Sequence, residues 1–420
     1  MKNDIEFLTK VTQVVAKMAE LHVPEGSDPR AIIDQWIHAI ATDSQLYCDV
    51  SVSSASDLKK IILDLLKKHG LFTTRGDFFE VAFGELKLKP LKAVSFRFID
   101  LFAGIGGVRL GFQNAGGSCV FSSEFDKHAQ QTYLQNHGEY PFGDITLIPP
   151  SSIPDHDVLL AGFPCQPFSH AGLKLGIEDT RGTLFHDIAE IIKNKKPSFA
   201  VLENVKGLIS HDKGYTLKVI LRTLTRIGYS CNIPKDIIEH GTTKQIQTLA
   251  KEMVLKSVDF GIPQNRQRIY IVLWRDGAIG RFEYPNPHNL TTRVGDILEA
   301  HPDPILTISD RLWAGHKRRK KDNKINGKGF GYGLVTHDSQ YTNTISARYY
   351  KDGSEILVDQ GNKNPRKVSI REAARLQGFP DIFEPSTSKV QAYKQFGNSV
   401  TVPVLEAIAK RLKGYLNDIN

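Results

Sequence analysis

The chain has 420 residues, 40% of them hydrophobic, so it is long enough for two or three domains with cores of their own. No apolar run reaches the length of a membrane span and the N-terminal stretch lacks a signal-peptide pattern, so the sequence predicts a cytosolic protein. The formal net charge of +8 indicates a polyanionic partner without establishing one. The four cysteines form no CxxC pair, which argues against a zinc site or a disulfide framework, and we expect no metal.

Residues 1–94 are predicted to form a small helical domain. The stretches "DIEFLTKVTQVVAKMAEL" and "DLKKIILDLLKKHGLF" repeat apolar residues every three or four positions, which is typical of helices. The serine cluster "SVSSAS" separates them, and "LKLKPLKAVS" is typical of a linker. Because no clear helix-turn-helix signature is present, we favour an accessory domain over sequence-specific DNA binding.

Residues 95–275 alternate between short apolar runs and helical stretches. The predicted strands are "RFIDLFA", "SCVFSSE", "DVLLAG", "FAVLE" and "RIYIVLW", and the predicted helices are "DKHAQQTYLQNH", "TLFHDIAEIIKN" and "TLKVILRTLTRIG". Strands that are apolar on both faces indicate an α/β domain with a parallel sheet covered by helices. Ligands bind such sheets at the carboxyl ends of the strands, so the chemistry is to be sought in the loops that follow them.

The alternation stops at residue 276. Residues 276–365 are polar and rich in glycine, proline and asparagine, and are predicted to be irregular. Within 316–328, seven residues are Lys or Arg; the alternatives are phosphate contacts or a solvated charge run. A helical pattern returns over 366–420, with "SIREAARLQGF" and "VPVLEAIAKRLKGYL", and we expect this segment to rejoin the α/β domain.

A glycine-rich loop, "DLFAGIGG" at 100–107, follows the first predicted strand. Its glycines permit a tight turn and close approach of a ligand, and its spacing differs from GxGxxG, which disfavours a nicotinamide dinucleotide. Glu124 ends the second strand and can accept hydrogen bonds from a ribose diol, and Asp144 can accept one from an adenine amino group. The alternative is a tight turn with two solvated carboxylates. The three features in order favour an adenosine-containing cofactor without a pyrophosphate, of which S-adenosylmethionine is the obvious member.

Cys165 follows the strand "DVLLAG" in a loop stiffened by two prolines. A thiolate there could act as a nucleophile, whereas a buried structural cysteine is the commoner alternative. Glu203 ends the next strand and could reach the same substrate. Gln264, Arg266 and Arg268 precede a further strand, where alternation predicts one shared face and two guanidiniums converging on a phosphate or a carbonyl oxygen. The alternative for the arginines is a salt-bridged surface.

In these motifs the chain resembles the cytosine-specific, carbon-5 DNA methyltransferases of the bacterial modification type. The matching blocks, in the order of that family, are "FIDLFAGIGG", "GFPCQPFS", "LENV", "QNRQRIYIV", "REAARLQGFP" and "QFGNSV", over roughly 95–420. The resemblance implies a Rossmann-like, S-adenosylmethionine-dependent methyltransferase domain and a target-recognition domain at 276–365. The N-terminal helical extension lies outside it.

The resemblance also implies a catalytic set of Cys165, Glu203, Arg266 and Arg268. The Cys165 thiolate would add to carbon 6 of cytosine, Glu203 would hold or protonate ring nitrogen 3, and Arg268 would hydrogen-bond the oxygen at position 2. The residues expected around the cofactor are Phe102, Gly104, Gly106, Gly107, Glu124, Phe125, Asp144, Ile145, Pro164, Leu184, Asn398, Ser399 and Val400.

The substrate implied is duplex DNA with the target cytosine flipped out of the stack. The stretch 169–185 corresponds to the family's mobile loop, with an ordinary exposed loop as the alternative; Ile345 departs mildly from the family's Thr-Leu pair. The expected site is a short GC-rich palindrome of the CCWGG or GGNCC kind. The residues expected to bind DNA are Ser169, Lys174, Arg181, Gln264, Thr344, Arg348 and Lys351.

The expected setting is a monomer in the bacterial cytosol, associated with the nucleoid, with a cognate restriction endonuclease acting on the same site. One competing reading is an RNA cytosine-5 methyltransferase of the same fold, which the long segment at 276–365 argues against. The other is a non-catalytic, DNA-binding member of the family, which the intact catalytic and cofactor motifs argue against.

Overall fold

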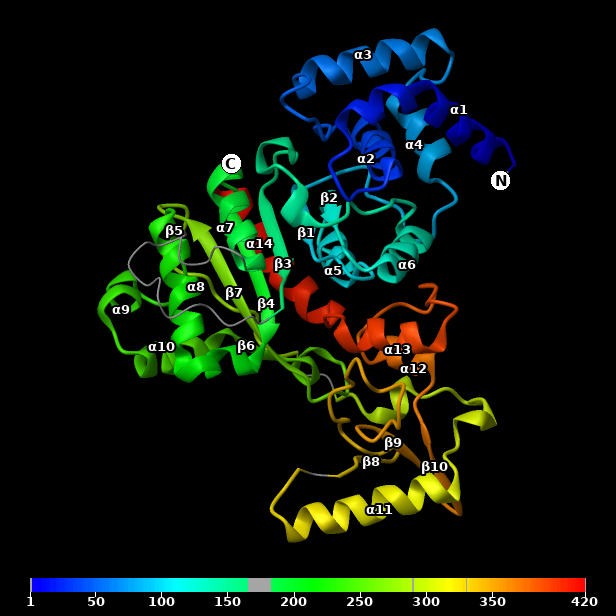
Figure 1. The fold of residues 1–420 in the computed structure, drawn as a ribbon, viewed down its shortest axis with the longest axis vertical. Helices are drawn as coiled ribbons and strands as arrows, with labels where there is room; N and C mark the ends of the chain where they lie inside the picture. The colour runs from blue at the N-terminus through cyan, green and yellow to red at the C-terminus, as the bar shows by residue number, and fades with distance from the viewer. Residues whose placement is uncertain (1, 165–182, 289–290, 330, 420) are drawn as a thin grey trace. The chain divides into compact units, whose positions relative to one another are not determined.

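The structure is a computed structural model that describes residues 2–164, 183–288, 291–329 and 331–419. The chain divides into two compact units (Figure 1). Unit 1 comprises Met1–Val254, Arg268–Pro285 and Glu406–Asn420, and unit 2 comprises Leu255–Gln267 and Asn286–Leu405. This division differs from the predicted domain limits, because the N-terminal helices fall in the same unit as the large sheet.

Unit 1 is built on a sheet with the strand order β2-β1-β3-β4-β7-β5 among the described residues. Strands β1 to β4 are parallel, whereas β7 runs antiparallel to both β4 and β5. The predicted α/β fold is confirmed, and the five predicted strands are present. The strands of the large sheet are β1 (Phe96–Leu101), β2 (Gly117–Ser123), β3 (Val158–Gly162), β4 (Phe199–Val205), β5 (Tyr229–Ser230), β6 (Val254–Lys256) and β7 (Gln267–Arg275).

Helices cover both faces of this sheet, since nearly every residue of β1 to β4 is buried. Capping residues set their ends: α6 begins after Asp126, whose carboxylate accepts from two backbone N–H groups, and stops at Gly138 in the left-handed conformation. The helices of unit 1 are α1 (Lys2–Ala19), α2 (Pro29–Thr42), α3 (Ala55–Lys68), α4 (Arg75–Phe83), α5 (Gly107–Asn114), α6 (Lys127–His137), α7 (Leu184–Lys195), α8 (Tyr215–Arg226), α9 (Lys235–His240) and α10 (Thr243–Leu249), together with most of α14 (Val402–Ile419).

Helix α2 packs against the edge strand of the large sheet. Gln35 Nε2 donates to the carbonyl of Val120 on β2 at 3.1 Å, and His38 Nε2 lies 3.1 Å from Ser118 Oγ on the same strand. Most of α2 is buried, including Trp36, so its sequence lacks the one-sided apolar stripe that marks a surface helix. The N-terminal helices therefore share the hydrophobic core of the sheet rather than enclosing a separate one.

A buried ionic group reinforces this contact. Arg109 on α5 makes two hydrogen bonds to the Glu139 carboxylate, at 2.6 and 3.0 Å, and His38 Nδ1 lies 2.8 Å from the same carboxylate. Burial opposes ionisation of Glu139, but the interactions of its carboxylate with Arg109 and His38 together outweigh this effect and lower the pKa of Glu139. Removing one member of such a group would leave an uncompensated buried charge, so it fixes α2 against α5 and the segment that follows α6.

Asp34 on α2 makes the stability of unit 1 depend on pH. Burial raises the pKa of this carboxyl to about 7, against the opposing effect of Arg30. Because an unfolded aspartate titrates near pH 4, the folded chain binds the extra proton between about pH 4 and 7, and its stability falls as the pH rises through that range. We compare the free energy of unfolding of Asp34→Asn with that of the wild type at two pH values. The difference in favour of the variant should be larger at about pH 8 than at about pH 4, by about 2–4 kcal/mol.

Thermal unfolding at the two pH values measures this difference. The control is Asp64→Asn on α3, which makes the same substitution at a side chain that is 64% exposed. An Asp34→Asn effect that is the same at both pH values would contradict the prediction.

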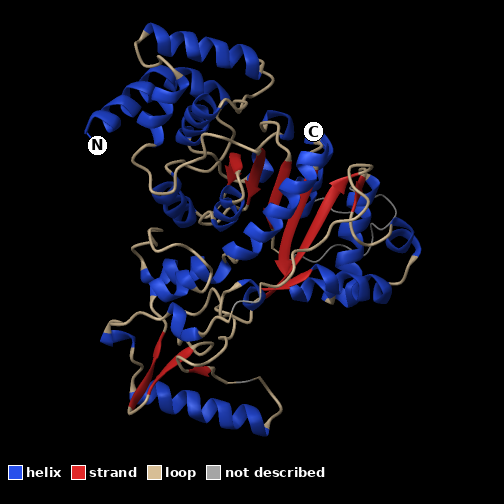
Figure 2. Ribbon diagram, turned by 180° about the vertical axis from the view of Figure 1, so that it is seen from behind, coloured by secondary structure: helices blue, strands red, loops and turns tan. Residues whose placement is uncertain are grey.

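Unit 2 contains a three-stranded sheet in the order β10-β9-β8, which Figure 2 shows beside the long helix α11. Helix α11 contains most of the basic run 316–328. The prediction that residues 276–365 are irregular is therefore wrong for this stretch. Lys and Arg favour helices and the hydroxyl of Ser309 caps the first turn, but only His316 is buried, which leaves no periodic apolar signal. The elements of this unit are β8 (Leu334–Val335), β9 (Leu357–Gln360), β10 (Lys363–Lys367), α11 (Asp310–Ile325), α12 (Ile370–Arg375) and α13 (Lys389–Asn398).

None of the helices among the described residues has both the length and the apolarity needed to cross a membrane. Nor do the described residues bring together three or more His, Cys, Asp or Glu side chains in a group that could hold a metal ion.

Candidate active site

The glycine-rich loop after β1 has the backbone shape of a ligand-binding turn. Phe102, Gly104 and Gly106 all have positive φ angles, of 59°, 57° and 85°. Gly106 caps the start of α5, and a Cβ atom there would lie 2.1 Å from His137 Nε2, so only glycine fits. At Gly104 the space where a Cβ would stand is open. The loop therefore offers exposed backbone to a ligand at Gly104 while α5 starts directly behind it.

Glu124 lies beside this loop, at the end of β2. Its carboxylate accepts hydrogen bonds from the backbone N–H groups of Gly104 and Asp126, each at 2.7 Å. Burial raises the pKa of Glu124, against the opposing effect of these two N–H groups. The next residue, Phe125, leaves 76% of its surface exposed. A fixed carboxylate next to an open aromatic ring suits an adenosine, whose hydroxyls need an acceptor and whose base needs an apolar surface.

Asp144 and Ile145 lie on a neighbouring turn of unit 1. Asp144 is half-buried and caps a short 3-10 helix, Ile145–Leu147, by accepting hydrogen bonds from Thr146 N at 3.0 Å and Thr146 Oγ1 at 2.9 Å. One cavity of about 730 Å³ is lined by both Phe125 and Asp144. Phe125 and Asp144 thus border one cavity, and the assignment of these residues to S-adenosylmethionine stays a prediction.

The other predicted cofactor residues are spread more widely. Gly107 is the first residue of α5, Leu184 is the first residue of α7, and Pro164 is the last described residue after β3. Asn398 ends α13 in unit 2, followed by Ser399 and by Val400, which is buried. Their assignment to the cofactor stays a prediction.

Glu203 and Arg268 form an ion pair at the carboxyl edge of the large sheet. Arg268 Nε lies 3.2 Å from Glu203 Oε1, and the two side chains are only 16% and 15% exposed. The antiparallel direction of β7 explains the pair, since it places the start of β7 at the end of β4, with Val205 opposite Arg268 in the register. A residue near the start of one strand thereby meets a residue near the end of another.

The same edge leads towards Cys165. Glu203 on β4 is in register with Gly162 on β3, and a Cβ atom at Gly162 would lie 3.5 Å from Glu203 Oε2. The described chain continues for only two residues beyond Gly162. Cys165 itself lies outside the described residues, as do Ser169, Lys174 and Arg181.

Asn204 supports this edge, although the sequence analysis gave it no role. Its side-chain amide is buried, donates to the carbonyl of Phe163 at 2.7 Å, and accepts from the backbone N–H of Val205 at 2.8 Å. Asn204 thus ties the end of β4 to the end of β3. The "LENV" block could have indicated this role, because a polar residue near the end of a buried strand needs hydrogen-bond partners inside the protein.

The three described cysteines are poor nucleophiles. Cys48, Cys119 and Cys231 are buried free thiols. Burial raises the pKa of Cys48 and raises that of Cys119 and of Cys231 to about 12, which disfavours the thiolate. Their burial is typical of structural cysteines.

Arg266 and Gln264 have structural partners in unit 2, which corrects two expectations. Arg266 is 2% exposed, and its guanidinium donates to the carbonyls of Ile345, Gly397 and Ser399. Gln264 is fully buried and its amide is bonded to the backbone of Leu376 and Ile345. Arg268, by contrast, pairs with Glu203. The alternation argument fails because β7 begins only at Gln267, so Arg266 and Gln264 do not share a strand face with Arg268. The catalytic assignment of Arg266 and the DNA-binding assignment of Gln264 stay predictions.

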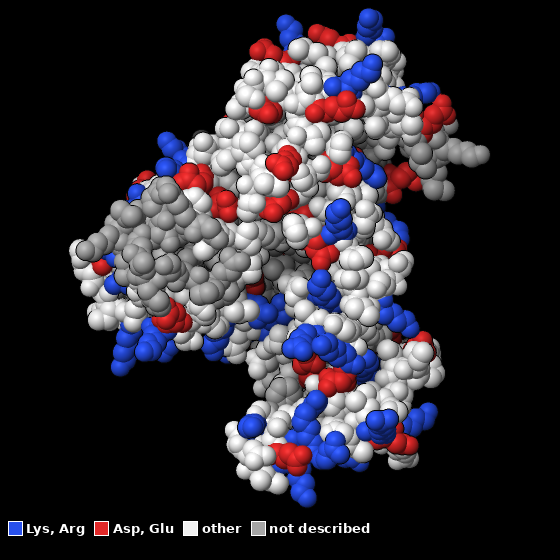
Figure 3. Space-filling view, viewed as in Figure 1, with Lys and Arg blue, Asp and Glu red and all other residues white. Residues whose placement is uncertain are grey.

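The remaining predicted DNA-binding residues lie on the surface of unit 2. Thr344 is half-buried and its hydroxyl donates to the carbonyl of Asn265 at 2.9 Å, whereas Arg348 and Lys351 are exposed. Helix α11 adds a further basic surface, and Figure 3 shows Lys and Arg gathered over this unit with a few Asp and Glu among them. The exposed basic side chains of this helix are Arg311, Lys317, Arg318, Lys320, Lys321 and Lys324.

Comparison with known proteins places this site in a family. The family model of the C-5 cytosine-specific DNA methylases matches residues 96–414. The Type II methyltransferase M.NlaX of Neisseria lactamica is 57% identical over 328 residues, covering 77% of this chain and 98% of the relative. The Type II methyltransferase M1.ScrFI of Lactococcus lactis subsp. cremoris is 55% identical over 325 residues, covering 76% of this chain and 79% of the relative.

Among solved structures, the Schizosaccharomyces pombe Dnmt2 methyltransferase has the same fold, with a TM-score of 0.59 at 20% identity over 77% of this chain and 99% of that one. The predicted Rossmann-like methyltransferase fold is thereby confirmed, and S-adenosylmethionine is the methyl donor that the family uses. The chain belongs to the family of C-5 cytosine-specific DNA methylases.

Proposed function

We propose that this protein methylates carbon 5 of one flipped cytosine in a short duplex DNA site, using Cys165, Glu203 and Arg268. The coarser part of this statement, DNA cytosine-5 methylation with S-adenosylmethionine in a restriction-modification setting, follows from family membership. The observation that carries the assignment of residues is the Glu203–Arg268 ion pair. Glu203 is paired in the sheet with Gly162 on β3, the strand that precedes Cys165 in the chain.

The chemistry follows from the electronic properties of cytosine. Carbon 5 of the aromatic ring is a weak nucleophile, and addition of the Cys165 thiolate to carbon 6 converts the ring into an enamine that is nucleophilic at carbon 5. Glu203 would hold a proton at ring nitrogen 3, and Arg268 would hydrogen-bond the oxygen at position 2, so both stabilise the charge that develops on the ring. When bound, S-adenosylmethionine supplies an electrophilic methyl group. Loss of the carbon-5 proton and release of the thiolate then restore the aromatic ring.

For recognition of DNA, we assign α11 to the phosphate backbone and Arg348 and Lys351 to base edges. Exposed lysines give affinity without sequence preference, whereas an arginine or lysine that reaches a guanine edge gives specificity. The proposed site is a GC-rich palindrome of the CCWGG or GGNCC kind. We further propose that the protein acts as a monomer on nucleoid DNA in the bacterial cytosol, paired with a restriction endonuclease for the same site.

The test is incubation of the purified protein with S-adenosylmethionine and unmethylated genomic DNA, followed by bisulfite sequencing. We expect 5-methylcytosine at a single short palindrome. Methylation of transfer RNA in a parallel reaction, with none in DNA, would replace the proposal by the RNA alternative. Dispersed methylation without a consensus would contradict sequence-specific recognition.

The assignment of Asp144 to the cofactor gives a separate prediction. Asp144→Ala removes the proposed acceptor for the adenine amino group, so the dissociation constant for S-adenosylmethionine should rise by about tenfold. Affinity for DNA should change by less than about twofold, since no DNA contact is assigned to this residue. Isothermal titration calorimetry and a DNA-binding assay measure the two quantities. An unchanged cofactor affinity would remove the assignment.

A further inference from the structure

The N-terminal region borders the turn that carries Asp144. The turn 26–29, which leads into α2, lines the same cavity as Phe125 and Asp144. The hydroxyl of Ser27 accepts a hydrogen bond from the backbone N–H of Gly143 at 3.0 Å, directly before Asp144 in the chain. The two backbones approach so closely that a Cβ atom at Gly143 would lie 2.2 Å from the carbonyl oxygen of Gly26. The position of Asp144 therefore depends on a residue that the family model does not cover.

A second chain of hydrogen bonds reaches Glu124. Asp34 on α2 accepts from the backbone N–H of Tyr140 at 2.9 Å, and the Tyr140 hydroxyl donates to Gln130 Oε1 at 2.9 Å. Gln130, which is 5% exposed, donates in turn to the carbonyl of Glu124 at 2.6 Å. Each link joins half-buried or buried groups, where a lost hydrogen bond leaves a polar group unsatisfied.

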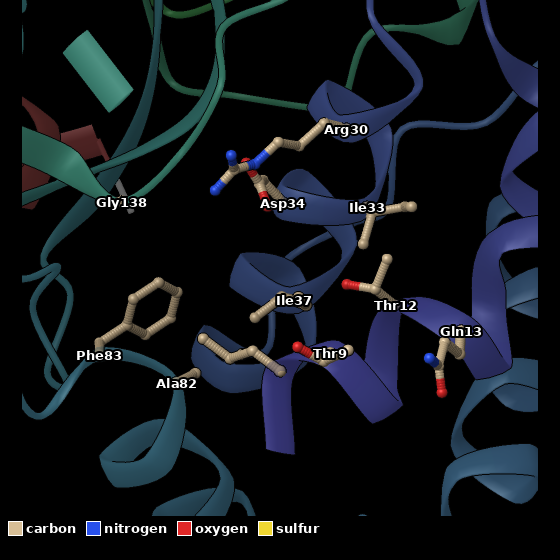
Figure 4. A pocket seen from close by; sticks show the side chains of 11 residues that line it. Thr9, Thr12, Gln13, Arg30, Ile33, Asp34, Ile37, Ala82, Phe83 and Gly138 are labelled. Carbon is tan, nitrogen blue, oxygen red and sulfur yellow. The ribbon is translucent and has the colours of Figure 1, made fainter. Parts of the chain in front are cut away.

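Asp34 is itself held firmly at the start of this chain. Arg30, one turn earlier on α2, lies with its Nε 3.3 Å from Asp34 Oδ2. Figure 4 shows the two side chains pointing toward one another at the wall of a cavity of about 560 Å³, which Ile37 and Phe83 also line. The start of α2 is thus held by the Arg30–Asp34 pair within the helix and by hydrogen bonds to the segment 139–143.

We propose that Ser27, Asp34 and Tyr140 are positioning residues for S-adenosylmethionine. Ser27 holds the turn that contains Asp144, and Asp34 is connected through Tyr140 and Gln130 to the backbone of Glu124. This inference rests on the proposed assignment of those two carboxylates to the cofactor. It gives residues 1–94 a part in cofactor binding.

Ser27→Ala tests the proposal in the full-length protein. We expect the dissociation constant for S-adenosylmethionine, measured by calorimetry without DNA, to rise about three- to tenfold. In turnover, KM for S-adenosylmethionine should rise by the same factor while kcat stays within about twofold, since the reacting groups are untouched. Ser27→Thr keeps the hydroxyl and should restore the wild-type affinity.

Ser54→Ala is the matched control. Ser54 is also an N-terminal serine whose hydroxyl accepts a backbone N–H, from Asp57 at 3.2 Å, but it caps α3, and its other hydrogen bonds, to Ser56 Oγ and to the Asp57 carboxylate, stay within that helix. It should lower the melting temperature as Ser27→Ala does and leave the cofactor affinity unchanged. Tyr140→Phe, which removes only the link to Gln130, should weaken cofactor binding independently of Ser27.

The outcomes separate the inference from the proposed function. If Ser27→Ala and Tyr140→Phe both bind S-adenosylmethionine as tightly as the wild type, the positioning role is overturned whatever the methylation assay shows. If both variants lose affinity and Ser54→Ala does not, the inference holds even when the DNA target differs from the one proposed. A wild type that does not bind the cofactor at all would overturn both.

Discussion

Cys165→Ala should reduce methyl transfer roughly 10⁴-fold or more, because the proposed mechanism requires the Cys165 thiolate to form the bond to carbon 6 that makes carbon 5 nucleophilic. Binding should survive, since the proposed contacts to S-adenosylmethionine and to duplex DNA come from other side chains. The rate is measured as incorporation of a labelled methyl group into unmethylated DNA. Dissociation constants for the cofactor and for DNA are measured on the same preparation, so that a misfolded variant is recognised.

Cys231→Ala is the control for this substitution. Cys231 is a buried free thiol whose pKa burial raises to about 12, so it cannot supply a thiolate near neutral pH. This variant should lose some stability and keep its activity. Turnover near the wild-type rate in Cys165→Ala would rule out covalent addition as the mechanism.

Glu203→Gln should lower kcat by about 10²–10⁴-fold and leave cofactor affinity unchanged. The substitution keeps the size of the side chain and one hydrogen-bond acceptor for Arg268, but removes the charge and the proton that ring nitrogen 3 requires as the thiolate adds. The effect should therefore appear in the chemical step rather than in substrate binding, and single-turnover kinetics with saturating DNA measures that step.

Glu239→Gln tests whether loss of any partly buried ion pair would do the same. Glu239 pairs with Arg222 at 2.6 Å in the same unit, with side chains 23% and 25% exposed, but it belongs to α9, away from the edge that holds Glu203. Its removal should change stability alone. A Glu203→Gln variant with kcat within about twofold of the wild type would show that the pair with Arg268 is structural.

In the N-terminal region, hydrophobic periodicity predicts the exposed helices but not the buried one. The exposed helices, α1 and α3, were predicted because each carries an apolar stripe on one face. Helix α2 was not singled out, since burial on nearly all sides leaves no polar face to produce a period. Its contacts with β2 and with Glu139 join residues more than 80 positions apart, and no local pattern records such a pairing.

Five strands and three helices of the α/β domain, the glycine-rich turn and the family can be read from the sequence alone. Each of these is written in short, contiguous stretches whose periodicity or residue order depends on local geometry. The candidate nucleophile, Cys165, is likewise known from its motif alone.

Tertiary structure decided which of the candidate side chains meet. The antiparallel direction of β7 brings Arg268 to Glu203, and the packing of unit 2 buries Arg266 among backbone carbonyls, although the two arginines are only two positions apart. Strand direction and burial follow from contacts between distant segments, since a strand has the same alternation in either direction. For this reason the candidate groups of the site can be named from the sequence, whereas the ion pair between Glu203 and Arg268 is seen only in the fold.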